Sequence, residues 1–336
     1  MTSGRAATPI AVLGAGSWGT ALAVQLARGG LPVTLWGRNA ADLQDLATHR
    51  SNRRYLPGVT LPESVGLDDD LQRVVRAHQE LIVCVPSHAF RTTLAALRPA
   101  LGAGTRIAWA TKGFEQGTGR LPHEVAAEEL GSAVPVAVLS GPTFAREVGA
   151  GLPTAMTVAA SDSAFAASLA TRLSDRMFRA YTSDDMVGVE VGGAVKNVLA
   201  IGAGISDGLG FGANTRIALI TRGLVEMTRL GAALGARAAT FMGLSGMGDL
   251  VLTCTDDQSR NRRFGLAIAR GETAVDAARR IGQVVEGQFA ASAVRAVAHR
   301  LSLEMPICEQ VYRVLEDQVS PQDAVMALMA RALKPE

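Results

Sequence analysis

The chain has 336 residues, of which 48% are hydrophobic and 19% are charged, and its net charge is +2. This length is too great for one ordinary hydrophobic core and predicts two domains of about 150 residues each. The nearly balanced charge gives no reason to expect nucleic acid or a membrane surface as a partner.

The three cysteines, Cys84, Cys254 and Cys308, are far apart and lack metal-ligand spacing. We therefore expect reduced thiols, no metal site and a cytoplasmic location. The residues before Ile10 are polar and contain no apolar core of a signal peptide. No apolar run is long and uninterrupted enough to span a bilayer, so we expect no membrane insertion.

The first half of the chain alternates short apolar runs with segments of helical periodicity. Such alternation predicts an α/β fold with a Rossmann-like, doubly wound parallel sheet. The predicted strands are residues 10–13, 33–36, 81–85, 107–110 and 136–139, and residues 154–159 and 178–181 could extend the sheet. The predicted helices between them include residues 20–28, 40–48 and 90–97.

The first predicted strand runs directly into residues 14–19, Gly-Ala-Gly-Ser-Trp-Gly, and then into a predicted helix. This pattern between a strand and a helix is typical of a dinucleotide-binding loop. Gly14 would make the tight turn, Gly16 would admit a pyrophosphate, and Gly19 would let the helix pack on the strand. The phosphates would lie on the N-terminal amides of the helix. The alternative is a glycine-rich turn without a ligand.

The end of the second predicted strand indicates which dinucleotide binds. An NAD site usually offers an acidic residue there to the ribose 2′-hydroxyl, whereas this chain has Arg38. Because a cation suits a 2′-phosphate, we expect NADP as the preferred cofactor and NAD as an accepted one. A surface arginine after a strand is also ordinary. Because Asn39 follows Arg38 in place of a second basic residue, the strength of the preference stays open.

Three further predicted strands lead into residues 86–87 (Pro-Ser), 111–113 (Thr-Lys-Gly) and 140–143 (Ser-Gly-Pro-Thr). Ligands of open α/β sheets bind outside the carboxyl ends of the strands. We therefore expect these segments to surround one crevice together with Gly14 and Arg38. Within them, Lys112 is a candidate functional residue, and the alternative is a solvated loop lysine.

The predicted strands stop after about Asp184, and the remainder of the chain is predicted to be helical. We therefore place a dinucleotide-binding domain at residues 1–186 and an all-helical substrate-binding and catalytic domain at residues 187–336. The predicted helix breaks are at Gly231, Gly235, Gly271, Pro306 and Pro321.

Residues 187–205 have the pattern of a helix that is apolar nearly all round, which is typical of a helix in a protein interior. Lys196 and Asn197 lie in its middle, so the ammonium would be desolvated and its pKa lowered. A pKa near the operating pH suits a general acid, so we favour a catalytic Lys196. Gly192 and Gly193 would leave room beside the backbone for something other than protein. The alternative is that Lys196 extends to the surface.

Two segments of the helical half place an acidic residue beside glycines. Residues 243–249, Gly-Leu-Ser-Gly-Met-Gly-Asp, read as a glycine-rich loop that delivers the carboxylate of Asp249. Residues 284–287, Val-Val-Glu-Gly, contain Glu286 and indicate little by themselves.

Ser259 is a predicted helix N-cap, followed by Arg260 and Asn261 on the first turn. Basic residues at a helix start oppose the macrodipole, and a bound anion would reverse that cost. The planar fork of arginine suits a phosphate monoester. The alternative is a group of surface arginines over residues 260–263.

Taken together, these motifs resemble those of the bacterial-type NAD(P)-dependent glycerol-3-phosphate dehydrogenases over nearly the whole chain. Because several motifs occur in the right order, the resemblance is far more specific than any one of them. The motifs are residues 14–19, 55–58 (Tyr-Leu-Pro-Gly), 111–113, 140–145, 195–197 (Val-Lys-Asn), 206–210 (Ser-Asp-Gly-Leu-Gly) with 214–216 (Asn-Thr-Arg), 248–250 (Gly-Asp-Leu) and 259–261.

This resemblance implies a role for each matching residue. The implied catalytic residues are Lys196 as acid/base, with Asn197, Asp249 and Lys112. The implied substrate contacts are Lys112, Gly141, Thr143, Lys196, Asp249, Thr253, Ser259, Arg260 and Asn261, of which Arg260 and Asn261 would bind the phosphate. The expected cofactor contacts are Gly14, Gly16, Ser17, Trp18, Gly19, Arg38, Lys112, Ala145, Arg260, Val284 and Glu286.

The implied reaction is the NAD(P)H-dependent interconversion of dihydroxyacetone phosphate and sn-glycerol 3-phosphate, which supplies the backbone of phospholipids. Lys196 would stabilise the carbonyl oxygen and supply its proton, held in place by Asn197 and Asp249. We expect these small molecules as partners, and a homodimer. Two alternatives stay open: a related reductase of another small hydroxy acid, and a catalytically silent dinucleotide-binding regulator.

Overall fold

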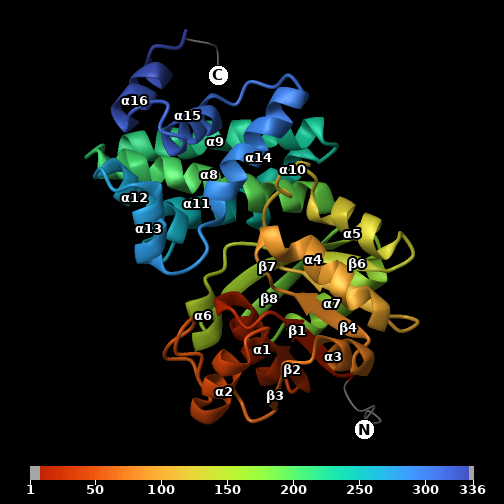
Figure 1. The fold of residues 1–336 in the computed structure, drawn as a ribbon. Coiled ribbons are helices and arrows are strands. Elements are labelled where there is room, and N and C mark those ends of the chain that lie inside the picture. The colour runs from red at the N-terminus through yellow and green to blue at the C-terminus, as the bar shows by residue number, and fades with distance from the viewer. Residues whose placement is uncertain (1–7, 333–336) are drawn as a thin grey trace. The chain divides into compact units, whose positions relative to one another are not determined.

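The computed structural model describes residues 8–332, which form two compact units (Figure 1). The first unit ends at Thr111 and resumes over Pro122–Met186, and the second consists of Lys112–Leu121 and the chain from Val187 onward. The change of unit after Met186 falls close to where the predicted strands stop. The sequence did not indicate that the segment Lys112–Leu121 leaves the first unit.

The first unit is built on one sheet of eight strands. The strands are β1 (Ile10–Leu13), β2 (Val33–Trp36), β3 (Val65–Asp68), β4 (Glu80–Val83), β5 (Arg106–Trp109), β6 (Val136–Ser140), β7 (Thr154–Ala160) and β8 (Phe178–Ser183). Their order is β3-β2-β1-β4-β5-β6-β7-β8, and the pairs from β3 to β6 are all parallel. β7 pairs antiparallel with β6 and parallel with β8. The predicted doubly wound sheet is confirmed, with two reversed strands at one edge.

Edge strand β3 was not predicted, because its sequence Val-Gly-Leu-Asp carries only a weak strand pattern. Of its four residues only Val65 is fully buried. Its backbone pairs in register with β2, from Val33 opposite Val65 to Trp36 opposite Asp68. This strand therefore forms because it pairs with β2, and the local sequence pattern does not indicate such a pairing.

Helices cover both faces of the sheet. They are α1 (Ser17–Arg28), α2 (Ala40–His49), α3 (Leu71–Ala77), α4 (Ser87–Leu97), α5 (Pro122–Leu130), α6 (Ala145–Ala150) and α7 (Ser163–Leu173), with a 3-10 turn η1 (Arg98–Ala100). Buried side chains of α1, α6 and α7 form one core cluster with alternate residues of the strands, such as Val12 and Leu139. On the opposite face Phe90 of α4 meets Trp109 edge to face, with ring centroids 5.4 Å apart.

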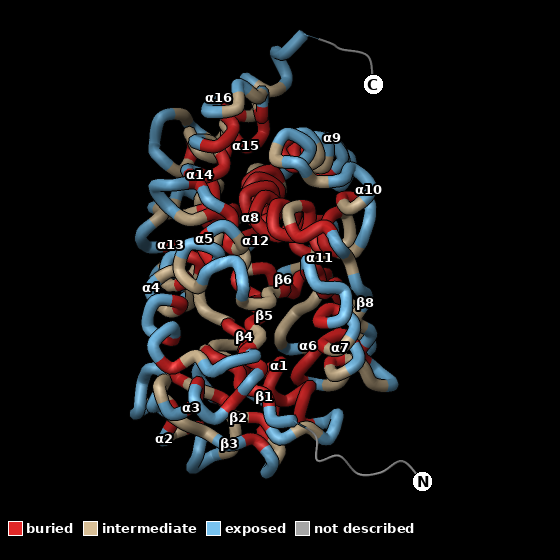
Figure 2. The backbone as a smooth tube through the Cα atoms, turned by 90° about the vertical axis from the view of Figure 1, so that its right-hand side faces the viewer, coloured by how far each residue is buried: buried red, intermediate tan, exposed pale blue. Residues whose placement is uncertain are grey.

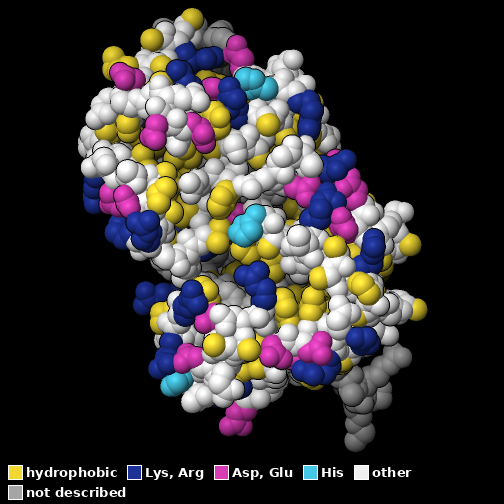
Figure 3. Space-filling view, viewed as in Figure 1, with side chains coloured by type: hydrophobic (Ala, Val, Ile, Leu, Met, Phe, Trp, Pro, Cys, Tyr) yellow, Lys and Arg dark blue, Asp and Glu magenta, His cyan; other side chains and the backbone are white. Residues whose placement is uncertain are grey.

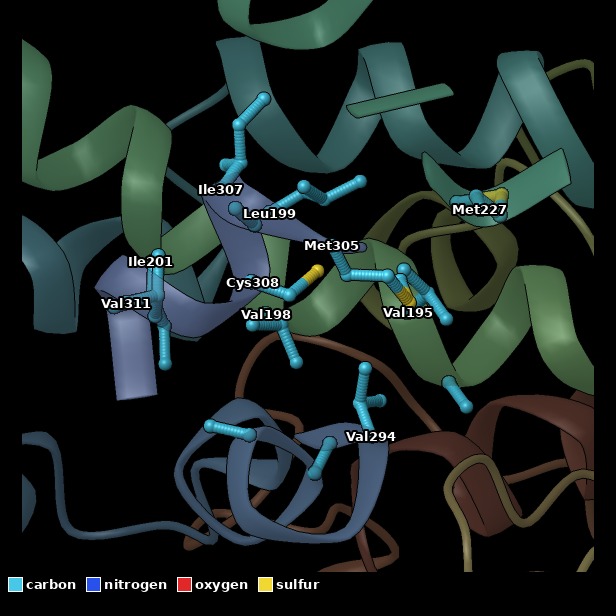
Figure 4. Close-up of a cluster of buried hydrophobic side chains, with 14 of the residues drawn as sticks. Val195, Val198, Leu199, Ile201, Met227, Val294, Met305, Ile307, Cys308 and Val311 are labelled. Atoms are coloured by element: carbon cyan, nitrogen blue, oxygen red, sulfur yellow. The ribbon is translucent and has the colours of Figure 1, made fainter. Parts of the chain in front are cut away.

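From Val187 to residue 332 the second unit contains helices and no strands, and it is organised around α8 (Met186–Gly208), which is buried almost along its whole length (Figure 2). Val195, Val198 and Leu199 of α8 pack with Met227, Val294 and Cys308 from three other helices (Figure 4). The other elements are α9 (Ala213–Ala233), α10 (Ala238–Phe241), η2 (Leu244–Gly248), α11 (Asp249–Thr255), α12 (Arg260–Ala269), α13 (Ala274–Ile281), α14 (Glu286–Arg300), α15 (Pro306–Leu315) and α16 (Pro321–Met329).

Helix α8 is long and apolar enough to cross a membrane by length and composition alone. Its sequence is not an uninterrupted apolar run, because Glu190 and Lys196 lie among the apolar residues. In the structure 94% of its most apolar stretch is buried inside the protein. Burial on all sides explains why the helix is apolar all round, so α8 is a core helix.

The predicted helix break at Gly231 is wrong. It lies inside the last turn of α9, where an added Cβ would be 2.1 Å from the ring of Phe241. The glycine therefore serves close packing, which outweighs its poor helix propensity. The helix instead ends shortly before Gly235, whose φ is +93°. Pro306 and Pro321 are the first residues of α15 and α16, a position that proline favours.

Candidate active site

In the first unit, the glycine loop between β1 and α1 is shaped to receive a phosphate group. Gly14 has a φ of +125°, and an added Cβ would be 2.5 Å from the carbonyl oxygen of Cys84. Gly19 packs so closely that its Cβ would lie 1.9 Å from the Gly14 carbonyl oxygen. At Gly16, by contrast, nothing lies within 4 Å of an added Cβ. No side chain caps α1 at Gly16, so the first-turn amides are suited to an anion.

Residues 52–55 support this loop. The Ser17 hydroxyl donates to the carbonyl oxygen of Tyr55 at 2.6 Å. The Asn52 side-chain amide donates to the Ala15 carbonyl oxygen at 3.0 Å and to the Thr20 hydroxyl at 2.8 Å. These bonds hold the loop and the start of α1 in one conformation.

The indole nitrogen of Trp18 is buried and has no hydrogen-bond partner among the described residues. A buried donor without a partner costs free energy, and a bound ligand can supply the missing acceptor. Together with the open space at Gly16, this makes the first unit a good fit for a dinucleotide diphosphate.

Arg38 is separated from the end of β2 by Gly37 alone and is exposed. The next residue, Asn39, caps α2 by accepting hydrogen bonds from the backbone N–H of Ala41 at 2.9 Å and of Asp42 at 3.2 Å. This capping explains why position 39 is an asparagine and carries no second positive charge. Arg38 is thus the residue at this strand end with a charge suited to a 2′-phosphate.

The predicted contacts Gly141 and Thr143 lie in the turn between β6 and α6 in the first unit, and Ala145 is the first residue of α6. Gly141 has a φ of +150°, and an added Cβ would be 2.9 Å from the Cα of Met156 in β7. The Thr143 hydroxyl donates to the Gly141 carbonyl oxygen at 3.2 Å. The antiparallel neighbour β7 therefore accounts for the glycine, and the roles of these residues toward substrate and cofactor stay predictions.

In the second unit, four of the predicted site residues meet around one buried carboxylate. Asp249 is 1% exposed. One of its oxygens accepts a hydrogen bond from Lys196 Nζ at 2.5 Å, and the other accepts one from Lys112 Nζ at 2.7 Å. Lys196 Nζ also donates to the Thr253 hydroxyl at 3.0 Å. Lys196 is 8% exposed, so the alternative of a lysine that extends to the surface is wrong.

The surroundings of this cluster shift the pKa values of its members. Burial lowers the pKa of Lys196 to about 8, with the charge of Lys112 acting in the same direction and that of Asp249 opposing it. For Asp249, burial alone would raise the pKa, but the two ammonium groups outweigh it and lower the pKa below its ordinary value. The predicted lowering of the Lys196 pKa is confirmed. At neutral pH Lys196 is therefore charged but close to releasing its proton.

Two details around Lys196 differ from the sequence analysis. The space beside Gly192 is filled by protein, because an added Cβ would be 2.3 Å from the carbonyl oxygen of Ser245. The segment before Asp249 is also no loop, since η2 is a π-helical turn that leads directly into α11. The glycines thus let η2 approach α8, which brings the Asp249 carboxylate to Lys196.

A relay of hydrogen bonds between backbone groups and side-chain amides links α8, α12 and α14. The Asn197 side chain donates to the Gly193 carbonyl oxygen at 3.1 Å and accepts from the Asn261 side-chain amide at 2.9 Å. The Asn261 oxygen accepts from the backbone N–H of Gly287 at 2.9 Å. Because an added Cβ on Gly287 would be 2.5 Å from the Asn197 carbonyl oxygen, only glycine fits there. Sequence reasoning gave Gly287 no role, although it follows Glu286 directly.

The start of α12 agrees with its prediction. Ser259 is the N-cap, and its hydroxyl accepts from the backbone N–H of Arg262 at 3.2 Å. Arg260 donates to the side-chain oxygen of Gln283 at 3.3 Å. Burial lowers the pKa of Arg260, and the charge of Glu286 opposes that shift. Gln283 was not predicted as a site residue. Its position next to the predicted contact Val284 is the one signal in the sequence that could have indicated it.

Within residues 8–332, no group of three or more histidine, cysteine, aspartate or glutamate side chains is placed to bind a metal ion. Cys84, Cys254 and Cys308 are free thiols. Burial raises the pKa of Cys254 to about 12. This thiol therefore stays protonated beside the Lys196 cluster.

Comparisons with known proteins agree with the resemblance found in the sequence. The family model described as the N-terminus of NAD-dependent glycerol-3-phosphate dehydrogenase matches residues 9–166, and the model of its C-terminus matches residues 185–326. The chain is 56% identical over 332 residues to the glycerol-3-phosphate dehydrogenase (NAD(P)+) of Pseudoalteromonas translucida, covering 98% of this chain and 99% of that protein. It is 53% identical over 330 residues to the protein of the same name from Haemophilus influenzae, covering 98% of each.

Solved structures give the same picture. The crystal structure of glycerol-3-phosphate dehydrogenase from Coxiella burnetii matches with a TM-score of 0.94 at 49% identity, over 97% of this chain and 99% of that one. A ketopantoate reductase from Ralstonia eutropha matches with a TM-score of 0.61 at 18% identity, over 95% of this chain and 100% of that one. The second match shows a shared fold alone.

Proposed function

Because the chain belongs to the NAD-dependent glycerol-3-phosphate dehydrogenase family, we propose that it interconverts dihydroxyacetone phosphate and sn-glycerol 3-phosphate. NADP is the preferred cofactor and NAD an accepted one, and the product supplies phospholipid synthesis. The observation that carries this proposal is the buried Lys196, held by Asp249 and Thr253 in the same unit as Arg260.

The role of Lys196 follows from its hydrogen bonds. An ammonium has three N–H donors. Asp249 and Thr253 take two of them, and we assign the third to the carbonyl oxygen of the substrate. Lys196 Nζ then stabilises the charge that develops on this oxygen and transfers a proton to it. A bound reduced nicotinamide supplies the hydride that the carbonyl carbon accepts.

Asp249 orients this proton donor, and Lys112 keeps Asp249 ionised. Asn197 is the residue after Lys196 on α8. Its hydrogen bond with Asn261 holds its side-chain amide in one orientation. Arg260 and the start of α12, where Asn261 lies, receive the phosphate, because the arginine charge and the positive end of the helix dipole both favour a dianion there.

The glycine loop, Ser17, Trp18 and Arg38 hold the dinucleotide in the first unit. That Lys112, Ala145, Arg260, Val284 and Glu286 also touch the cofactor remains a prediction.

A panel of carbonyl substrates tests the proposed function. Purified full-length protein with NADPH should reduce dihydroxyacetone phosphate and leave small keto acids at background rates. Preference for a keto acid would instead support the related reductase that shares this fold. NADPH binding without turnover of any phosphorylated carbonyl would support the catalytically silent regulator.

The pKa of Lys196 predicts opposite pH dependences for the two directions of the reaction. Reduction needs the protonated amine, so kcat/KM for dihydroxyacetone phosphate should fall as the pH rises through about 8. Oxidation of sn-glycerol 3-phosphate needs the neutral amine, so its kcat/KM should rise through the same range. Cys254 cannot cause this dependence, because burial raises its pKa to about 12. Steady-state pH profiles that change in the same sense in both directions would contradict the assignment.

Arg38→Ala tests the cofactor preference. Loss of a charge-assisted phosphate contact of about 1.5–3 kcal/mol should lower kcat/KM for NADPH roughly ten- to hundredfold. The value for NADH should be nearly unchanged, because NADH has no 2′-phosphate. Equal losses with both cofactors, or a loss with neither, would remove Arg38 from this role.

We further propose that the enzyme works in the cytoplasm as a homodimer. The three free thiols support a reducing compartment. Sedimentation equilibrium of the purified protein would test the homodimer. On the face drawn in Figure 3 basic and acidic side chains are interspersed, which is consistent with small-molecule partners.

A further inference from the structure

The motif at residues 206–210 has no part in the proposed site, yet it contains a buried acid in an unfavourable place. Asp207 lies in the last turn of α8, and Arg262 lies in the first turn of α12. The helix macrodipole disfavours a negative charge at a C-terminus and a positive charge at an N-terminus. Both residues therefore carry the wrong charge for their own helix, and each finds its counter-ion in the other.

The two side chains form a buried ion pair. Arg262 Nη2 donates to an Asp207 oxygen at 2.7 Å, and their side chains are 10% and 8% exposed. Arg262 Nη1 also donates to Asp257. Arg216 of α9 donates to both Asp207 oxygens, at 3.0 and 2.9 Å. Because apolar side chains often stabilise a fold as well as a buried ion pair does, this cluster suggests a task beyond stability.

The backbone of α12 rests directly on α8 at the same place. An added Cβ on Gly204 would be 2.0 Å from the Arg262 carbonyl oxygen, and one on Gly265 would be 2.1 Å from the Ile201 carbonyl oxygen. Glycines thus permit close approach of the two helices. Close approach alone does not determine how far α12 slides along α8. The bond from Asn261 to Asn197 fixes the two helices at one point, and the charged bond from Arg262 to Asp207 fixes them at a second point.

We propose that Asp207 is a positioning residue, which through Arg262 sets the separation between the first turn of α12 and Lys196 on α8. This inference rests on the proposed function, in which Arg260 and Asn261 receive the phosphate and Lys196 protonates the carbonyl oxygen. Dihydroxyacetone phosphate must reach both places at once, so its reaction depends on their separation. Unphosphorylated dihydroxyacetone needs only Lys196, so its reaction does not.

Asp207→Asn tests this role, because it keeps the shape of the side chain and removes the charge. A misplacement of about 1 Å can lower a rate on the order of a hundredfold, so kcat/KM for dihydroxyacetone phosphate should fall about ten- to hundredfold. The slow reduction of dihydroxyacetone should change little. A merely structural role would lower both rates in proportion to the loss of folded protein. Asp207→Glu restores the carboxylate and should recover part of the lost rate.

Arg216→Met is the matched control, because it removes the other partner of Asp207 on a helix that carries no proposed substrate contact. It should leave unchanged the ratio of kcat/KM for dihydroxyacetone phosphate to kcat/KM for dihydroxyacetone. If Asp207→Asn fails to fold, Arg262→Lys keeps the cation without its fork and should give the same change of ratio. Equal losses with both substrates, no loss, or the same effect from Arg216→Met would overturn the inference. Failure of the wild-type protein to reduce dihydroxyacetone phosphate would instead overturn the proposed function.

Discussion

Lys196→Met is expected to lower kcat for reduction of dihydroxyacetone phosphate by at least about 10²-fold, the lower range for a lost proton donor. Methionine is close to lysine in length and apolar, so it can fill the same buried space in α8. Asp249 keeps its hydrogen bond from Lys112, so the substitution does not leave the carboxylate without a counter-ion. The fold and the binding of NADPH to the glycine loop should therefore persist.

The measurement is single-turnover kinetics with NADPH, combined with thermal unfolding and NADPH titration of the same variant. Lys196→Ala should be equally inactive, because it also lacks the donor. If Lys196→Met binds NADPH and reduces the substrate at a near-normal rate, the lysine serves packing alone and the proposed mechanism is lost.

Arg260→Ala is expected to raise KM for dihydroxyacetone phosphate strongly. A hydrogen bond to a charged group contributes about 1.5–3 kcal/mol, which corresponds to a loss in kcat/KM of roughly ten- to hundredfold. Reduction of unphosphorylated dihydroxyacetone should change little, because that substrate never makes the contact. Steady-state kinetics with both substrates provide the comparison.

Two variants sharpen this test. Arg263→Ala removes an exposed arginine from the same helix turn and should leave both substrates unaffected. Arg260→Lys should rescue poorly, because lysine lacks the planar fork that binds two phosphate oxygens. If Arg260→Ala lowers the rates of both substrates equally, Arg260 is structural or serves the cofactor, and the phosphate site lies elsewhere.

Features encoded within one short segment could be predicted from the sequence. The glycine loop is defined by three glycines between a strand and a helix, and the structure confirms the required backbone at Gly14. The N-cap at Ser259 also depends on neighbouring residues alone, and it was correct. The burial of Lys196 followed from the apolar residues around it on α8, since a helix apolar on every side has no surface for solvent.

Features that depend on distant contacts could not be predicted. Nothing near Gly192 indicates that η2, about fifty residues later in the sequence, fills the space beside it. The bond between Asn197 and Asn261 likewise joins two helices 64 residues apart in the chain. Lys112 comes shortly after a strand of the first unit in the sequence, yet it belongs to the second unit, where its ammonium bonds to Asp249. In each case the tertiary fold, which no local pattern contains, decides the contact.

The measurement that tests the central claim most directly is the stoichiometry of the reaction catalysed by the purified full-length protein. NADPH oxidation and sn-glycerol 3-phosphate formation should be followed in one mixture after dihydroxyacetone phosphate is added at neutral pH. We expect one molecule of product for each NADPH consumed, and no consumption above background with Lys196→Met. Stable NADPH in the wild-type mixture, or NADPH oxidised without formation of sn-glycerol 3-phosphate, would contradict the proposed function.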